Sequence, residues 1–169
     1  MKANSTQELT KMALMVALNC ISAYIIIPLP FSLSPIALQT LVVNLTGYVL
    51  NVKQAAMTMA AYLLVGLAGV PVFTGGSSGP GKLFGPTGGY LIGFIFMAII
   101  SGVALKLSKA NVFITAAGMV VGTAVAYAFG TAWFVFQLKC ELSYALTVCV
   151  YPFIVFDLIK LVIGVCFGK

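Results

Sequence analysis

The sequence predicts an all-α membrane protein that forms a single membrane-embedded domain over residues 1–169. Hydrophobic residues make up 62% of the chain and charged residues only 7%, a composition that would leave large apolar patches on a water-soluble domain. The long uncharged runs also lack the alternating polarity of barrel strands. Because backbone groups inside a bilayer must be hydrogen-bonded within the protein, these runs are predicted to be spanning helices.

The charged residues lie mostly one at a time at the ends of the apolar runs. The net charge of +6 comes from nine basic residues, all of them lysine, against three acidic ones. A nucleic-acid-binding protein would gather such charges on one face, so nucleic acid is not expected as a partner. Lysines at the ends of apolar runs instead anchor helices in a lipid bilayer and set their orientation.

The first apolar run covers residues 10–27 and follows a short polar segment. It is not preceded by the small-residue cleavage pattern of a signal peptide, so we expect it to be retained as a helix. Closely spaced prolines at positions 28, 30 and 35 then predict an irregular loop, because proline removes a backbone donor and fixes its own φ. The second run, residues 36–50, is short.

A third run covers residues 55–70, after a charged break at 51–54. The following stretch, residues 71–86 with the sequence PVFTGGSSGPGKLFGP, is too rich in glycine and proline for a lipid-exposed helix. It predicts a long ordered loop, which is the kind of segment in which membrane proteins place ligand contacts.

Two long runs and a final helix make up the rest of the chain. The fourth run covers residues 87–105, and the fifth covers 112–129, where a glycine loosens the helical pattern. The segment 133–150 holds a lysine and a glutamate and is amphipathic enough to be an interfacial or re-entrant piece. The last helix is predicted to begin at Pro152, because proline is favoured in a first turn, and to end at residue 167.

These runs give six predicted spans in a multi-pass protein of the cell (cytoplasmic) membrane, with the N and C termini cytoplasmic. The positive-inside rule decides this orientation, because most lysines then lie on the side of the termini. The proline loop, the glycine-rich loop and the segment before the last helix all face outward. The cytoplasmic lysines are Lys2, Lys11, Lys53, Lys106, Lys109 and Lys169, whereas Lys82 and Lys139 lie outside.

Asp157 and Lys160 are the ionisable residues predicted within a spanning helix. Such a residue costs about 2.5–3.5 kcal/mol on insertion scales. Their spacing places both side chains on one helix face. Two interpretations stay open, namely a functional site and a structural ion pair. Because Asp157 is only about one and a half turns from Pro152, both groups would open toward the outer loops, which favours a ligand that arrives from outside.

The sequence disfavours enzymatic, nucleotide and metal chemistry. It has no histidine, and its only acid–base set is Asp157 with Lys160, so an intramembrane enzyme is a weak hypothesis. The glycine-rich loop lacks the GxxxxGK[ST] pattern of a phosphate loop. The absence of a CxxC motif argues against a metal site, and no cofactor is expected. Cys140 and Cys149 are either apolar filler or an external disulfide.

Short stretches spread along the chain form a more specific pattern than any single feature above. They are residues 35–41 (PIALQTL), 62–73 (YLLVGLAGVPVF), 85–94 (GPTGGYLIGF), 130–133 (GTAW) and 152–160 (PFIVFDLIK). In this order they resemble the BioY family, the biotin-specific substrate-binding (S) components of energy-coupling factor (ECF) transporters. The GPTGGYL and PF…DLIK blocks are the most specific of them.

The resemblance implies an S-component fold of six spanning helices that captures biotin from outside with high affinity. It implies as partners a transmembrane T component and two ATP-binding-cassette ATPases, which hydrolyse ATP, so that the chain itself is not an enzyme. In related S components an alanine motif of the first helix docks the T component. Here that motif corresponds to Ala13 and Ala17, whose spacing allows close helix packing.

The resemblance also implies that Asp157 and Lys160 contact biotin. Biotin carries a ureido ring, an apolar body and a carboxylate, so its site needs a few polar groups within apolar walls. A carboxylate can accept from the ureido N–H groups, and an ammonium can donate to the ureido oxygen. Lys82 is either a contact of the biotin carboxylate or a solvated loop lysine. Further predicted contacts are the hydrogen-bonding groups of Gln39, Thr87 and Tyr90 and the walls Phe73 and Trp133.

Three alternatives make different predictions. An S component for another vitamin would share the fold and differ in its loops. A membrane enzyme would use Asp157 and Lys160 as an acid–base pair and turn its ligand over. A structural membrane subunit would bind no saturable ligand.

Overall fold

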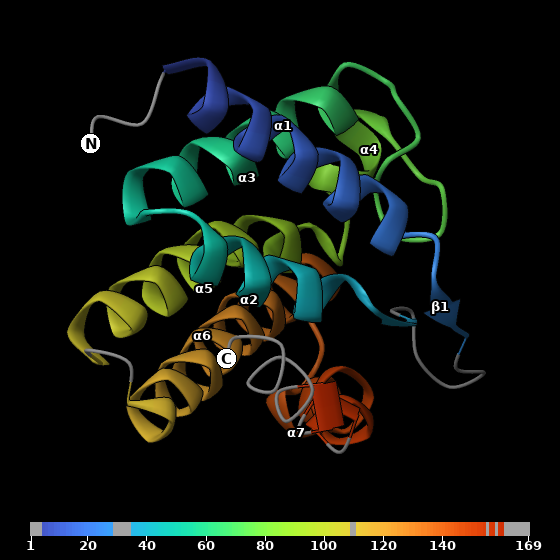
Figure 1. Cartoon of the computed structure of the whole chain (residues 1–169). Helices are drawn as coiled ribbons and strands as arrows, with labels where there is room; N and C mark the ends of the chain where they lie inside the picture. Colours follow the sequence, from blue (N-terminus) through green and yellow to red (C-terminus); the bar gives the residue numbers. More distant parts are fainter. Residues whose placement is uncertain (1–4, 29–34, 109–110, 155, 158, 161–169) are drawn as a thin grey trace.

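The computed structural model is mostly helical in the part of the chain that it describes (Figure 1). The described residues are 5–28, 35–108, 111–154, 156–157 and 159–160. The helices are α1 (Ser5–Ser22), α2 (Gln39–Val49), α3 (Val52–Leu67), α4 (Gly79–Leu83), α5 (Gly88–Ser108), α6 (Val112–Leu138) and α7 (Leu142–Cys149). Strands β1 (Ile26–Ile27) and β2 (Ile36–Ala37) pair antiparallel, with Ile26 opposite Ala37. A last helical run begins at residue 151 and includes the described residues up to 160.

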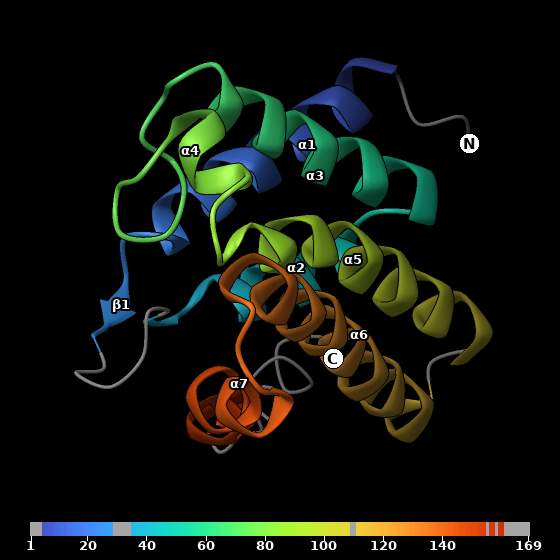
Figure 2. The same ribbon diagram turned by 180° about the vertical axis from the view of Figure 1, so that it is seen from behind.

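Helices α5 and α6 form the centre of the bundle and pack against each other along most of their lengths (Figures 1 and 2). Helices α2 and α3 pack on α5, α1 lies across α2 and α3, and α7 contacts α6. The starts of α1, α3 and α6 lie at one end of the bundle together with the ends of α2 and α5 (Figure 1). The β1–β2 hairpin and α4 lie at the other end, so the bundle has two distinct ends.

Sequence signals at the helix ends explain where several helices begin and stop. Asn51 caps α3, because its side chain accepts from the backbone N–H of Gln54 while the Gln54 side chain accepts from that of Asn51. Asn111 accepts from the N–H of Phe113 at the start of α6. At the far end of α6, Lys139 adopts the left-handed conformation with φ 48°, a common helix terminator.

Two helices of the described chain are long and apolar enough to cross a membrane, judged by length and composition. They are α5, with 21 residues and a mean hydropathy of 2.1, and α6, with 27 residues and a mean hydropathy of 1.9. Helix α3 and the stretch Leu142–Ile154 are apolar but shorter. Large apolar side chains stay exposed, and Phe113 is 86% exposed, as expected of a surface that contacts lipid.

Small residues bring α2, α5 and α6 into close contact. A Cβ added to Gly47 would lie 2.3 Å from the carbonyl oxygen of Ala98, and one added to Gly122 would lie 3.1 Å from the carbonyl oxygen of Met97. Beside this crossing, the buried Asn44 side chain accepts a hydrogen bond from Ser101 Oγ at 2.7 Å. Close backbone approach and interhelical hydrogen bonds of this kind stabilise helix pairs in lipid.

Gly47→Ala is therefore expected to destabilise the protein, because the added methyl group meets backbone that cannot move without shifting α5. Overpacking of this kind costs about 1–3 kcal/mol, so the melting temperature in detergent should fall. Gly81→Ala is the matched control, since nothing lies within 4 Å of a Cβ added there. Equal melting temperatures for the two variants would contradict this account of the α2–α5 contact.

The structure corrects the predicted boundaries near the C-terminus. Helix α6 continues to Leu138, so residues 133–138 extend a long helix and are not part of an interfacial segment. A mid-helix glycine costs only about 1 kcal/mol of helix propensity, and Gly130 packs against the ring of Tyr90. The last helical run begins at residue 151, beside the predicted Pro152. Cys140 and Cys149 are both free thiols, so the disulfide alternative is not formed.

Other differences concern the N-terminal half. Helix α1 begins at Ser5 and ends at Ser22, before the predicted end of the first run. The hairpin strands flank the proline loop, and the glycine-rich loop contains the short helix α4. Predictions for Lys2, Lys109, Lys169, Pro30 and the end of the last helix lie outside the described residues.

Candidate ligand-binding site

A cavity of about 50 Å³ lies toward the end of the bundle that carries the hairpin and α4. It is lined by β2 and the start of α2, by the loop around α4, by the facing sides of α5 and α6, and by the last helical run. Its walls are mainly apolar, and each of these parts also contributes a polar side chain. Such a mixture is typical of small-molecule sites.

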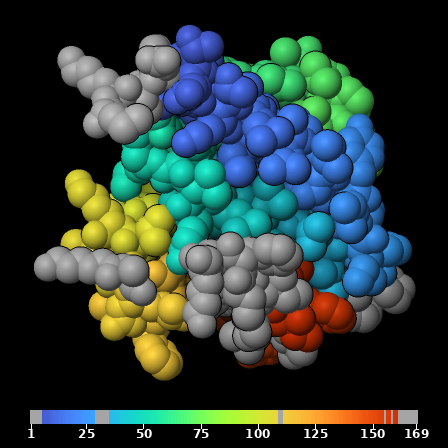
Figure 3. Space-filling model, in the orientation of Figure 1, coloured from blue at the N-terminus to red at the C-terminus, as the bar shows by residue number. Residues whose placement is uncertain are grey.

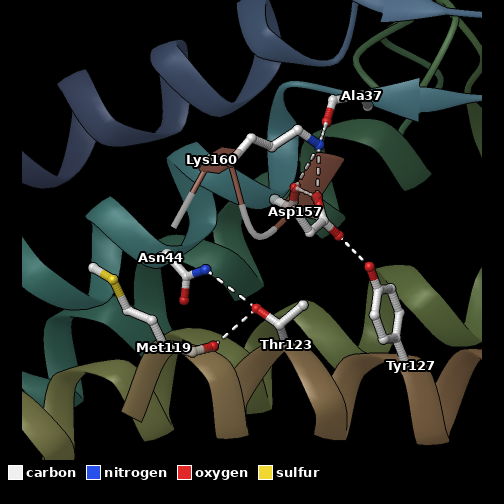
Figure 4. Close-up of polar contacts among 8 residues, drawn as sticks. Ala37, Asn44, Met119, Thr123, Tyr127, Asp157 and Lys160 are labelled. Carbon is white, nitrogen blue, oxygen red and sulfur yellow. Dashed lines mark hydrogen bonds and ion pairs between the residues drawn. The ribbon is translucent and has the colours of Figure 1, made fainter. Parts of the chain in front are cut away.

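Asp157 and Lys160 form a buried ion pair at the wall of this cavity (Figure 4). Lys160 Nζ lies 2.7 Å from Asp157 Oδ1 and also donates to the carbonyl oxygen of Ala37 at 2.6 Å and to Thr40 Oγ1 at 3.0 Å. Thr40 Oγ1 in turn donates to Asp157 Oδ1 at 2.8 Å. The hydroxyl of Tyr127 donates to the other carboxylate oxygen, Oδ2. All three donors of the ammonium are therefore used within the protein.

The pair is largely withdrawn from solvent, since the side chains of Asp157 and Lys160 are only 6% and 13% exposed. A single unpaired charge of either sign would be strongly destabilised in such surroundings. A hydrogen-bonded pair offsets much of that cost, because each charge satisfies the other. A polar ligand could replace some of these internal hydrogen bonds and keep both charges satisfied.

Helix α6 carries a polar stripe toward the cavity. Thr123 and Tyr127 lie four residues apart on one face of the helix, and both line the cavity. Thr123 Oγ1 accepts from Asn44 Nδ2 at 3.4 Å, which ties the stripe to α2 (Figure 4). On α5, the Tyr90 hydroxyl donates to the carbonyl oxygen of Cys149 at 3.0 Å. The two tyrosines thus connect the central helices to the C-terminal part of the chain.

The loop between α3 and α5 contributes a second cation. Lys82 of α4 lines the cavity together with Thr74 and Thr87. It forms no hydrogen bond or ion pair with another residue that the structure describes. Partial burial lowers the pKa of its ammonium, because desolvation disfavours the charged form. An anionic group in the cavity would favour that charged form again.

Several predicted contacts do line the cavity, and three do not. Gln39 is fully buried, donates to the Tyr62 hydroxyl at 2.6 Å and accepts from Thr74 Oγ1 at 3.1 Å. It therefore supports the wall through Thr74 and does not face the cavity itself. The predicted residues among the cavity lining are Asp157, Lys160, Tyr90, Thr87 and Lys82.

The two predicted aromatic walls also lie behind the lining. Phe73 is fully buried, and its ring meets that of Tyr62 edge-on with 5.7 Å between the centroids. Trp133 Nε1 donates to the carbonyl oxygen of Gly85 at 3.0 Å, which fixes the end of the glycine-rich loop on α6. Both residues therefore hold the parts of the chain that shape the cavity.

Thr40, Thr123 and Tyr127 line the cavity, although sequence reasoning did not single them out. Tyr127 is 30 residues from Asp157 along the chain, so only the fold brings the hydroxyl to the carboxylate. One signal was available in the sequence. Hydroxyl side chains at positions 123, 127 and 131 recur every four residues in an otherwise apolar run, which is typical of one polar helix face.

Helix α1 lies at the surface of the molecule, as the space-filling view shows (Figure 3). Ala13 and Ala17 are both exposed on its outer face. On the inner face, Met12, Met15 and Val16 pack against the core. The two alanines predicted to dock a partner thus lie on a surface that no described element covers, beside the exposed side chains of Leu14 and Leu18.

A mostly helical apolar bundle with a small cavity of mixed polarity defines a helical membrane protein of the ligand-binding class. The profile of the BioY family matches residues 1–169. The chain is 34% identical over 168 residues to the biotin transporter BioY2 of Lactococcus lactis subsp. cremoris, with 99% of this chain and 91% of that protein covered. It is 38% identical over 158 residues to the biotin transporter BioY of Thermotoga maritima, with 94% and 91% covered.

A solved structure gives the same answer for the fold. The crystal structure of the S-component for biotin from an ECF-type ABC transporter matches with a TM-score of 0.91 at 30% identity, and the match covers 99% of this chain and 92% of that chain. This chain therefore belongs to the BioY family and has the S-component fold.

Proposed function

We propose that this protein is the biotin-binding S component of an ECF-type transporter, which captures biotin outside the cell for uptake across the cytoplasmic membrane. The observation that carries the proposal is the buried Asp157–Lys160 pair at a cavity of mixed polarity, in a chain of the BioY family. Ionisable residues within membrane helices usually mark substrate sites. As a substrate-binding subunit, the protein itself catalyses no reaction.

The polar groups of the cavity match a cyclic urea that carries a carboxylate tail. Asp157 accepts from a ureido N–H, and Lys160 donates to the ureido oxygen in place of the Ala37 carbonyl. The rings of Phe94 and Phe153 supply apolar wall for the rest of the bicyclic body. The cavity of about 50 Å³ is smaller than the roughly 300–1,000 Å³ of typical ligand sites. Binding therefore has to displace groups that now fill it.

Within this proposal residues 1–169 form one membrane-embedded domain of six spans, with both termini cytoplasmic. The exposed side chains of Lys53 and Lys106 support the orientation, because they belong to the start of α3 and the end of α5 at the same end of the bundle (Figure 1). The positive-inside rule places that end in the cytoplasm. The cavity then opens at the outer face, and the alanine face of α1 is left for a T component that works with two ATPases.

Calorimetry of the purified protein in detergent tests the function. Biotin is expected to bind saturably, and a panel of other vitamins should not displace it at comparable concentrations. Displacement at a lower concentration by a different vitamin would make this an S component for that vitamin. Mass spectrometry should recover the bound biotin chemically unchanged, since turnover would indicate an enzyme. No saturable binding of any vitamin would overturn the proposal in favour of a structural subunit.

The affinity for biotin is expected to fall as the pH rises through the alkaline range. Burial lowers the pKa of free Lys82, and a bound carboxylate would raise it again. At a pH above the pKa of Lys82 in the protein without biotin, binding of biotin is accompanied by the uptake of a proton. The affinity is therefore constant below that pKa and declines above it. Calorimetric titrations between about pH 7 and pH 10 measure this slope.

Two lysine variants serve this test. Lys82→Met should bind biotin more weakly and with a flatter pH profile. Lys139→Met is the control, because this exposed lysine lies outside the cavity lining, and it should keep the slope of the parent protein. If Lys82→Met keeps both the affinity and the slope, Lys82 is a solvated loop lysine.

A further inference from the structure

The Asp157–Lys160 pair matches one edge of a cyclic urea and leaves the other edge without a partner. Lys160 Nζ and Asp157 Oδ1 lie 2.7 Å apart, so the pair presents a donor beside an acceptor. The carbonyl oxygen and one N–H of a urea form the complementary acceptor and donor on a single edge. The second N–H points away from that edge, so it needs an acceptor elsewhere in the cavity wall.

Two hydroxyl groups of the wall are too near Asp157 to be that second acceptor. Thr40 and Tyr127 both donate to the Asp157 carboxylate. Acceptors for the two opposite N–H groups must lie about 7 Å apart, because a hydrogen bond of about 2.9 Å extends from each side of the ring. The second acceptor therefore belongs to a part of the wall that does not contact the carboxylate.

Thr123 offers an acceptor at such a position. It lines the cavity and lies one helical turn from Tyr127, about 6 Å along the axis of α6. The described side chains of Thr123 and Asp157 share no hydrogen bond (Figure 4). The Thr123 hydroxyl donates its proton to the carbonyl oxygen of Met119 at 2.8 Å. A hydroxyl oxygen has two lone pairs, and only Asn44 Nδ2 approaches one of them, at 3.4 Å.

The direction of the ligand favours Thr123 over Tyr90, the remaining hydroxyl that the central helices contribute to the cavity. Tyr90 lies in the first turn of α5, at the end of the bundle that carries α4 (Figure 1). Thr123 lies near the middle of α6. With its carboxylate tail toward Lys82 of α4, a bound biotin has its urea ring farther from that end, at the level of Thr123.

We propose that Thr123 determines specificity by accepting a hydrogen bond from the ureido N–H that points away from Asp157, whose carboxylate accepts from the other. The inference rests on the proposed function. A ligand with oxygen in place of that N–H sets two acceptors against each other with no proton between them. Thr123 is only 5% exposed, so water cannot readily relieve this contact, and a buried polar group without a partner is strongly penalised.

Calorimetry with biotin and two cyclic-carbamate analogues tests this role. In each analogue one of the two ureido N–H groups is replaced by oxygen. Thr123→Val keeps the shape of the side chain and removes the hydroxyl, so it should weaken biotin binding by about tenfold. It should cause no loss of affinity for the one carbamate that lacks the N–H facing Thr123. Thr123→Ser restores the hydroxyl and should restore the preference for biotin over that carbamate.

Thr115→Val is the matched control on the same helix. Thr115 is also buried, and its hydroxyl also donates to a carbonyl oxygen one turn back, that of Asn111 at 3.1 Å. It does not line the cavity, so this variant should bind biotin like the parent protein. An equal loss of affinity in Thr115→Val and Thr123→Val would trace the effect to the helix and overturn the inference.

The parent protein provides a test that needs no variant, because it should bind both carbamates more weakly than biotin. Equal binding of all three ligands would overturn the inference. An equal loss for all three in Thr123→Val would also overturn it, since the hydroxyl would then only shape the wall. Unchanged biotin affinity in Thr123→Val, beside a loss in Asp157→Asn, would sink this inference and leave the proposed function standing. A parent protein that binds no biotin would sink both.

Discussion

Replacing Asp157 with Asn should weaken biotin binding by about 10- to 100-fold, because hydrogen bonds to charged groups contribute about 1.5–3 kcal/mol each. An amide accepts at one atom only, so it cannot serve Lys160, Thr40, Tyr127 and a ligand at once. Lys160→Met should cause a similar loss, since the ureido oxygen then has no cationic donor. Calorimetry measures both, and unchanged affinity in both variants would remove this pair from the site.

Stability measurements on variants of the same two residues also distinguish a ligand site from a purely structural ion pair. Each single variant leaves one buried charge unpaired, which costs about 3–5 kcal/mol of stability. The double variant Asp157→Asn with Lys160→Met removes both charges, so its melting temperature should recover toward that of the parent protein. Its biotin affinity should stay low, and recovery of both properties would leave the pair with a structural role alone.

Glu141→Gln is the control for these charge changes. Glu141 is exposed before α7, and its carboxylate accepts from Ser143 Oγ at 3.3 Å in the same turn. Loss of an exposed charge has little effect on stability. Biotin affinity and melting temperature should therefore match those of the parent protein.

Tryptophan at both Ala13 and Ala17 should abolish assembly with the T component and leave biotin capture intact. The two alanines lie exposed at a four-residue spacing on the outer face of α1, where small side chains allow a partner helix to approach. Two indole rings would hold that helix away. Co-purification of the S component with the T component and the ATPases measures assembly, and calorimetry on the isolated variant measures capture.

The control places the same bulk at the same spacing elsewhere. Ala117 and Val121 are both exposed on α6, and tryptophans there should leave the complex intact. An intact complex from the Ala13 and Ala17 variant would show that docking uses another surface. Loss of the complex in both double variants would point to a general effect of bulky residues on the membrane surface.

The positions of the long helices were largely predictable, because they depend on local pattern. Residues 87–105 were predicted as one run, and α5 covers Gly88–Ser108. The end of α6 was not predictable, because Gly130 weakens the helical pattern. The ring of Tyr90 that packs on this glycine belongs to another helix. A propensity argument takes no account of such a neighbour.

The candidate site was predictable only where one segment carries the signal. The charges of Asp157 and Lys160 stand out in an apolar run and share a helix face, and the structure pairs them at 2.7 Å. Gln39 stands out equally as a polar residue, yet its partners Tyr62 and Thr74 come from other parts of the chain. Tyr127 was missed for the converse reason, because its importance comes from a contact with a residue far along the sequence.

In the proposed site, the Ala37 carbonyl oxygen that accepts a hydrogen bond from Lys160 would compete with the ureido oxygen of biotin for the same donor. Both are carbonyl oxygens that can accept from an ammonium, and the first of them belongs to strand β2. The affinity for biotin would therefore depend on the difference in free energy between these two hydrogen bonds. In that proposed site, weakening the contact between Lys160 and Ala37 would raise the affinity for biotin, and strengthening it would lower the affinity.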